Sequence, residues 1–152
     1  MAVRTFAFNK LIRDKMYDYI ENKGAQISLS EIKTKSDLIS CFKKKLLEEV
    51  FEVNEAQNDK DLLEELADCL EVINGFVKNL LLRDEFEAIR KAKNLKRGRF
   101  DKPIMVDTIS VSATSTDPDY YKFFIDYCMK AQDKYPEINN VVRKEKSSEG
   151  VI

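Results

Sequence analysis

The chain has 152 residues, of which 43% are hydrophobic and 35% charged, and its formal net charge is −1; this is the size and composition of one soluble globular domain. The sequence contains no histidine, which excludes serine–histidine–aspartate and cysteine–histidine catalysis and any histidine-bearing zinc site. Because the charges nearly balance, the chain has no overall attraction to nucleic acid or to a membrane surface, and we expect neither as a stable partner.

The spacing of apolar residues predicts two helices in the first part of the chain. The first runs from Asn9 to Lys23 and ends at Gly24, a residue suited to the left-handed conformation that often follows a helix. The second opens at Ser36 and carries apolar residues at helical spacing as far as Val53.

A short polar connection separates the second helix from a third, so we expect these two helices to pack antiparallel. Asp61 with Glu64 resembles a capping box and precedes a strongly amphipathic run. Asp84 with Glu87 repeats the capping pattern ahead of a fourth helix, which we expect to end at Gly98.

The C-terminal part has a different pattern. Residues 103–112 are rich in β-branched side chains and predict an extended segment, and residues 117–136 predict a last, aromatic-rich helix. The predicted fold class is all-α, with a four-helix-bundle-like core, a short extended segment and an extra C-terminal helix. The predicted domains are residues 1–113 and an extension with a polar tail, residues 114–152.

Cysteine usage and the N-terminus indicate a cellular compartment. The three cysteines, Cys41, Cys69 and Cys128, are widely spaced and form no C-x-x-C pair, so we interpret them as buried thiols. The N-terminal residues lack the apolar stretch of a signal peptide, and no run approaches the roughly 18 apolar residues of a membrane span. We therefore expect a cytoplasmic protein.

The charges are sorted along the chain. Residues 48–71 contain ten acidic residues against the single base Lys60, a local net charge of −9, whereas residues 88–102 carry seven bases against one acid, a net charge of +6. Solvated helix faces usually mix the two signs, because opposite charges at i,i+4 stabilise a helix by about 0.2–0.5 kcal/mol and like charges destabilise it by a similar amount. The acidic segment therefore predicts a site that holds cations.

Two pairs of carboxylates define this predicted site. Glu49 and Glu52 share one face of the second helix, and Glu65 and Asp68 share one face of the third. An antiparallel connection can bring the two pairs opposite each other, where four carboxylates need a cation to remain charged. Hard oxygen ligands in this number suit Mg²⁺, with Mn²⁺ as a possible substitute.

Three motifs together resemble a known family. They are Asn9-Lys10-Leu11-Ile12-Arg13-Asp14-Lys15, the pairs Glu49-x-x-Glu52 and Glu65-x-x-Asp68, and Lys93-x-x-x-Arg97-Gly98-x-Phe100. Over roughly residues 8–110 the chain resembles the all-α nucleoside triphosphate pyrophosphohydrolases, in particular the MazG-like, phosphoribosyl-ATP pyrophosphohydrolase-like house-cleaning branch. The resemblance implies an α-helical bundle that binds Mg²⁺ and cleaves a nucleoside triphosphate, in this branch a noncanonical one, to the monophosphate and pyrophosphate.

The chain departs from this branch at two places. Members commonly have Ile-Pro where this chain has Met16-Tyr17, and two glycines where it has Gly98-Arg99. Both differences lie in segments on the substrate side, so they bear on nucleotide preference and not on the metal ligands.

The predicted roles combine charge and resemblance. Glu49, Glu52, Glu65 and Asp68 are the expected metal ligands, and Glu48 and Glu49 are the expected catalytic carboxylates. Glu48 could orient or deprotonate the attacking water, but an adjacent residue points about 100° away around a helix, which leaves this role open. The candidate phosphate contacts are four basic residues: Lys10, Arg13, Lys93 and Arg97. We interpret the run Lys43-Lys44-Lys45 as solvated.

The expected function is Mg²⁺-dependent hydrolysis of a nucleotide substrate. Two alternatives stay open: phosphoribosyl-ATP hydrolysis, and a helical adaptor without catalysis that oligomerises through its apolar faces. The apolar residues between 62 and 81 give the third helix more apolar face than one neighbour can cover. We therefore expect a homodimer or a larger homo-oligomer.

Overall fold

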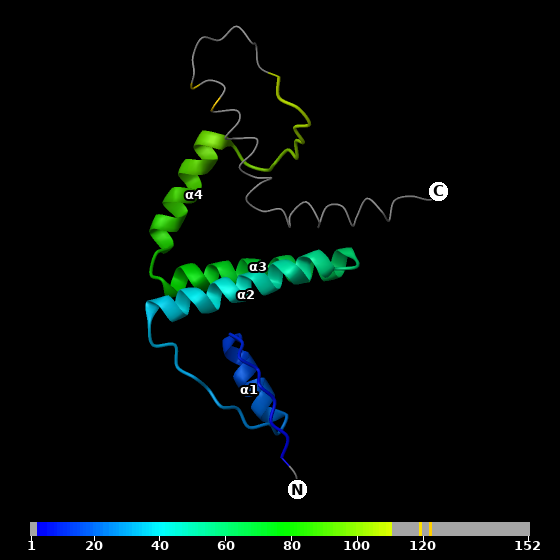
Figure 1. The fold of residues 1–152 in the computed structure, drawn as a ribbon, viewed down its shortest axis with the longest axis vertical. Helices are drawn as coiled ribbons and strands as arrows, with labels where there is room; N and C mark the ends of the chain where they lie inside the picture. Colours follow the sequence, from blue (N-terminus) through cyan, green and yellow to red (C-terminus); the bar gives the residue numbers. More distant parts are fainter. Residues whose placement is uncertain (1–2, 111–118, 120–121, 123–152) are drawn as a thin grey trace, which may run out of the picture. The chain divides into compact units, whose positions relative to one another are not determined.

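The computed structural model describes residues 3–110, 119 and 122. Within them the chain forms four helices and no strand, which confirms the all-α class (Figure 1). Contacts divide the chain after Gly98, and all four helices belong to the first unit, Met1–Gly98. The helices are α1 (Asp14–Asn22), α2 (Lys35–Glu55), α3 (Asp59–Asn79) and α4 (Arg83–Arg97).

The first helix begins at Asp14, so the predicted start at Asn9 is wrong. Asn9 has a φ of 47°, and Arg13 is extended with φ −66° and ψ 147°. Neither a left-handed nor an extended residue continues a right-handed helix, so the helix does not run across this segment. Lys10 and Arg13 of the segment pair with Glu48 and Asp68, as described below. The end of α1 was predicted correctly, since Gly24 is left-handed at φ 85° and its N–H donates to the Glu21 carbonyl at 2.8 Å.

Side-chain caps set the starts of α2 and α3. The Thr34 hydroxyl accepts a hydrogen bond from the Asp37 N–H at 3.0 Å. The Asn58 side-chain oxygen accepts from the N–H groups of Lys60 and Asp61, each at 3.0 Å. The predicted capping role of Asp61 is therefore wrong. Asp61 lies inside the first turn of α3, where its negative charge interacts favourably with the positive end of the helix dipole.

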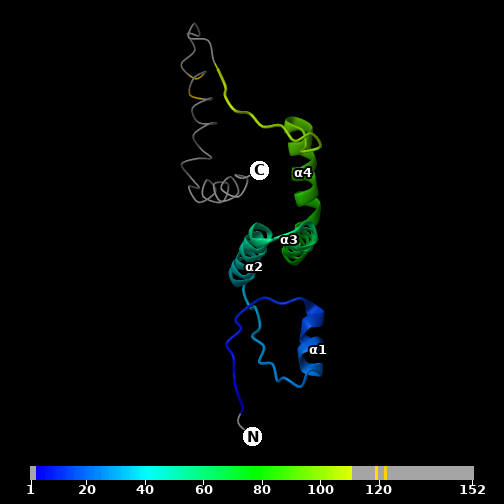
Figure 2. The ribbon, with the colours of Figure 1, turned by 90° about the vertical axis from the view of Figure 1, so that its right-hand side faces the viewer.

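The two long helices α2 and α3 lie side by side and antiparallel, as predicted, joined by the short connection 56–58 (Figures 1 and 2). Phe42 of α2 stacks on Phe76 of α3 with ring centroids 5.0 Å apart. A Cβ added at Gly75 would lie 3.3 Å from Cε1 of Phe42, so the missing side chain at Gly75 leaves room for this ring. Phe42 is 8% exposed and is the one buried apolar side chain among the described residues.

The fourth helix starts without a side-chain cap after Leu82, so the predicted capping pair of Asp84 and Glu87 is wrong. The Glu87 carboxylate accepts instead from Arg90, from Nε at 3.0 Å and Nη2 at 2.8 Å. The predicted stop is confirmed, because Gly98 has a φ of 78° and its N–H donates to the Asn94 carbonyl at 2.9 Å.

The helices are unequal in how they pack. The α2–α3 contact is much more extensive than the contact between α3 and α4. The core of the first unit is therefore one antiparallel helix pair. Large apolar side chains of this pair remain exposed: Leu47, Val50, Phe51, Leu63, Leu66 and Leu70.

Residues 103–110 form neither helix nor strand, in agreement with an extended segment. The rest of that segment, the predicted domain boundary at 113/114, the helix at 117–136 and the tail lie outside the described residues, apart from the isolated positions 119 and 122. None of the described helices combines the length and the apolar character that crossing a membrane requires.

Candidate metal centre

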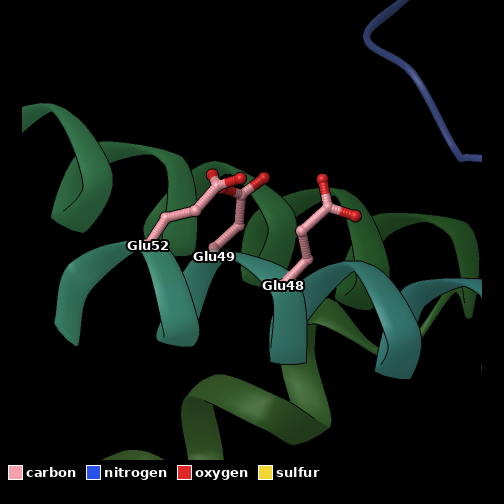
Figure 3. Close-up of side chains that lie close together, drawn as sticks. All are labelled: Glu48, Glu49 and Glu52. Carbon is pink, nitrogen blue, oxygen red and sulfur yellow. The ribbon is translucent and has the colours of Figure 1, made fainter. Parts of the chain in front are cut away.

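Three carboxylates of α2 gather on one side of the helix. Glu48, Glu49 and Glu52 each place a ligand oxygen within 4.8 Å of the other two. Figure 3 shows the three side chains rising from α2 to the same side, with the carboxylates of Glu49 and Glu52 next to each other. The one-residue offset between Glu48 and Glu49 therefore does not remove Glu48 from the cluster.

A second group joins the two helices. Glu49 of α2 and Glu65 and Asp68 of α3 also place ligand oxygens within 4.8 Å of one another. Glu49 belongs to both groups, so it is the central residue of the cluster. The antiparallel pairing of α2 and α3 thus brings Glu65 and Asp68 to Glu49, whereas Glu52 joins Glu49 only in the group within α2. The role of all four carboxylates in binding metal stays a prediction.

Glu49 occupies an unusual position for a carboxylate, since its side chain is only 3% exposed. Its Oε1 accepts from the Lys45 ammonium at 2.7 Å, whereas its Oε2 is buried and has no hydrogen-bond partner. A buried acceptor without a partner costs about 1–3 kcal/mol, and more when it is charged. A cation bound at Oε2 would remove this cost, so the residues present fit a divalent ion with hard oxygen ligands.

Neighbouring acidic groups change the pKa of Glu52. The pKa of Glu52 is raised, first because its carboxyl group can share a proton with the Glu49 carboxylate. Partial burial and the negative charges of Glu49 and Glu65 raise it further. The cluster is therefore short of positive charge around Glu49 and Glu52, which is the condition that a bound cation relieves.

Basic residues from outside the acidic segment neutralise the other side of the cluster. Lys45 donates to Oε1 of Glu48 at 2.8 Å, and Lys10 donates to the same oxygen at 3.1 Å. Arg13 forms an ion pair with Asp68. The charge of segment 48–71 is thus partly compensated by Lys45, just before the segment, and by Lys10 and Arg13, which are far away in the sequence.

The prediction that Lys45 is solvated is wrong. Its side chain is only 21% exposed and contacts two carboxylates. Burial by itself lowers the pKa of Lys45, but the hydrogen bonds to Glu48 and Glu49 outweigh burial and raise it. The signal that could have identified Lys45 is its spacing, three residues before Glu48 and four before Glu49.

Glu48 is held as a carboxylate. The hydrogen bond from Lys45 is the largest effect and lowers the pKa of Glu48; burial opposes it, and the bond from Lys10 lowers the pKa further. A carboxylate with a lowered pKa is a weaker proton acceptor, so two ammonium groups limit Glu48 as a general base while they hold it in place.

The four predicted phosphate contacts fall into two groups. Lys10 and Arg13 reach the carboxylate cluster through the ion pairs given above. Lys93 and Arg97 are exposed on α4, and within the described residues no ion pair joins them to the cluster.

The two cysteines in the described part of the chain are free and half-buried. Burial raises the pKa of Cys69, and the charges of Glu49, Glu65 and Asp68 raise it further. The Cys69 thiol is therefore kept protonated and is a poor nucleophile. Cys128 lies outside the described residues.

Comparison of the chain with known protein families, with characterised proteins and with solved structures finds no match.

Proposed function

We propose that this chain is a Mg²⁺-dependent nucleotide pyrophosphohydrolase that cleaves a nucleoside triphosphate to the monophosphate and pyrophosphate in the cytoplasm. The observation that carries the proposal is the buried Glu49 carboxylate, whose Oε2 lacks a partner at the point where two groups of acids meet. The motif resemblance to the MazG-like pyrophosphohydrolases supplies the reaction and the class of substrate.

In this proposal the four carboxylates Glu49, Glu52, Glu65 and Asp68 hold the metal. A divalent ion bound there supplies Lewis-acid chemistry to phosphate oxygens and makes a bound water more acidic. Glu48, fixed by Lys45 and Lys10, would orient the attacking water by accepting its hydrogen bond.

Basic residues of this chain would bind the phosphates. Lys10 and Arg13 already lie at the rim of the cluster, and their exposed side chains can exchange a carboxylate for a phosphate oxygen. Arginine suits this exchange because its guanidinium group matches the geometry of phosphate as well as that of carboxylate. Lys93 and Arg97 would contribute further charge-assisted hydrogen bonds.

We also propose that the chain is a homodimer. The exposed residues Leu63, Leu66 and Leu70 follow one stripe of α3 at i, i+3 and i+7 spacing, and Leu47 and Phe51 follow one stripe of α2 at i, i+4. Two antiparallel helices about 30 Å long present a face of the same order as the roughly 800 Å² per partner of a standard interface. A second copy is the occupant that we propose, since the exposed apolar stripes of two copies can pack on each other and two helix pairs would complete a four-helix core.

The experiment that tests the enzymatic proposal is an assay of the full chain against a panel of nucleoside triphosphates and phosphoribosyl-ATP, with pyrophosphate as the readout. We expect release that requires Mg²⁺ and that falls by at least about a hundredfold in Glu49→Gln, because loss of a ligand should exceed the effect of losing its supporting contacts. The matched control is Glu55→Gln, which removes the same charge from an exposed position of α2.

The outcomes separate the alternatives. A preference for phosphoribosyl-ATP over every triphosphate would replace the proposed substrate class. Absence of Mg²⁺-dependent pyrophosphate release from a folded wild-type protein would contradict the enzyme and favour the adaptor, for which the exposed leucines are the specific support.

A further inference from the structure

Lys45 is the one basic side chain that contacts the buried carboxylate at the centre of the cluster, among the described residues. Its ammonium lies 2.7 Å from Oε1 of Glu49 and 2.8 Å from Oε1 of Glu48. The order of this pair, with lysine preceding glutamate by four residues, is the less favourable one for a helix. Helix spacing makes the contact possible, and the negative charge of Glu49, which is 3% exposed, makes it important.

The other two cations of the cluster are placed differently. Lys10 pairs with Glu48 and Arg13 pairs with Asp68, and both basic side chains are about half exposed, at 46% and 56%. Water can replace these two ion pairs at small cost, as at other exposed pairs. Removal of Lys45 would instead leave the buried Glu49 carboxylate without a basic partner, so that only a proton shared with Glu52 could relieve its charge.

We propose that Lys45 is a resident counter-ion, which neutralises Glu49 in the metal-free protein and must release it when a divalent cation binds. The inference rests on the proposed metal site and concerns how that site exchanges one positive charge for another. Glu48 provides the alternative partner, since the ammonium already contacts it and can remain paired there after it leaves Glu49.

This exchange has two linked consequences. In the metal-free protein Lys45 neutralises the buried Glu49 carboxylate, so the protein is more stable than it would be without Lys45. The same contact competes with the cation for Glu49 and weakens metal binding, because binding must first break an ion pair. A neutral side chain at position 45 should therefore move stability and metal affinity in opposite directions.

The test compares Lys45→Met, which keeps the apolar stem, with two controls. Lys10→Met removes one charge from the same cluster but none from Glu49, and Lys44→Met removes one from an exposed neighbouring position. Mn²⁺ binding to the full chain is measured by isothermal titration calorimetry, and thermal melts are followed by circular dichroism with and without Mn²⁺. If Lys45→Met does not fold without metal, Lys45→Gln, which keeps a hydrogen-bond donor for Glu49, is measured in the same way.

We expect Lys45→Met to bind Mn²⁺ about tenfold more tightly than wild type, a factor equivalent to about 1.4 kcal/mol. We also expect it to melt at a lower temperature without metal, so that the shift on adding Mn²⁺ is larger than in wild type or either control. An affinity gain in Lys10→Met as large as that in Lys45→Met would overturn the inference in favour of a general charge effect. Unchanged or weaker Mn²⁺ binding in the position 45 variant, beside a wild type that binds, would overturn it too, whereas a wild type that binds no Mn²⁺ would overturn the proposed metal site itself.

Discussion

Glu49 and its neighbours show how one residue can organise a site at the scale of single side chains. The carboxylate is shared by two acidic groups, one within α2 and one across to α3. Its Oε1 is neutralised by Lys45, while Oε2 has no partner. Because Glu49 is buried, both the Lys45 contact at Oε1 and the missing partner at Oε2 are important: charge interactions that water would screen at the surface persist in the interior. Among the described residues, Lys93 and Arg97 of α4 form no ion pair with this network, so their role is predicted separately.

We predict that Arg97 acts on the substrate and not on the metal. A charge-assisted hydrogen bond to phosphate strengthens as charge develops during transfer, so Arg97→Ala should lower kcat/KM by roughly ten- to a thousandfold, or about 1.4–4 kcal/mol. Mn²⁺ affinity measured by calorimetry should change little. Lys91→Ala, which removes a charge from an exposed position of the same helix, is the control. Loss of Mn²⁺ binding in Arg97→Ala, or wild-type kcat/KM with every substrate, would identify the basic cluster as a solvated helix end.

At the scale of helices, α2 and α3 depend on a small number of specific contacts. Asn58 and Thr34 cap their N-termini, and Phe42 stacks on Phe76 between them. Gly75 lies inside α3, four residues before the last helical residue Asn79, and within a helix glycine costs about 0.5–1 kcal/mol relative to alanine. Its use there is explained by the Phe42 ring, which a Cβ would approach to 3.3 Å.

We predict that Gly75→Ala lowers the melting temperature in the wild-type background. Alanine gains about 1 kcal/mol of helix propensity, but crowding a packed ring costs about 1–3 kcal/mol, and Phe42 is fixed by its stack on Phe76. In a Phe42→Leu background the ring is absent, so the same change should become stabilising. Thermal melts of the double-mutant cycle measure this coupling. Stabilisation by Gly75→Ala in both backgrounds would show that the ring moves aside freely.

At the scale of the whole molecule, the helix pair exposes many apolar side chains beside its carboxylate cluster. On α3, helical spacing places Leu63, Leu66 and Leu70 away from the face that carries Glu65 and Asp68. Only one apolar side chain is buried among the described residues. Such a small core supplies little of the hydrophobic free energy that folding needs, which is the physical reason for expecting a second copy.

We predict a homodimer at micromolar concentration that Leu66→Glu converts to a monomer, measured by sedimentation velocity. A charge placed in a leucine interface is buried without a partner and costs several kcal/mol. Leu95→Glu is the matched control, because Leu95 is 91% exposed on α4, away from the α2–α3 face, and it should leave the dimer intact. A monomeric wild type, or a dimer that survives Leu66→Glu, would place the contact elsewhere or remove it.

The local pattern of the sequence was sufficient for much of this description. The i,i+3 and i,i+4 spacing of apolar residues determined the all-α class, and the glycines at 24 and 98 determined two helix ends. The same spacing placed Glu49 with Glu52, and the short connection placed that pair opposite Glu65 and Asp68. These features are predictable because helix geometry fixes which residues share a face.

Only the tertiary structure decided how the charges are paired. Lys10 lies 38 residues from Glu48, and Arg13 lies 55 residues from Asp68, so no local period signals either pair. Lys45 was within helical reach of Glu49, but its importance depends on the burial of Glu49 against α3. Local spacing is encoded in neighbouring residues, whereas the burial of a charge, and the partner that it then requires, exists only after the helices have packed.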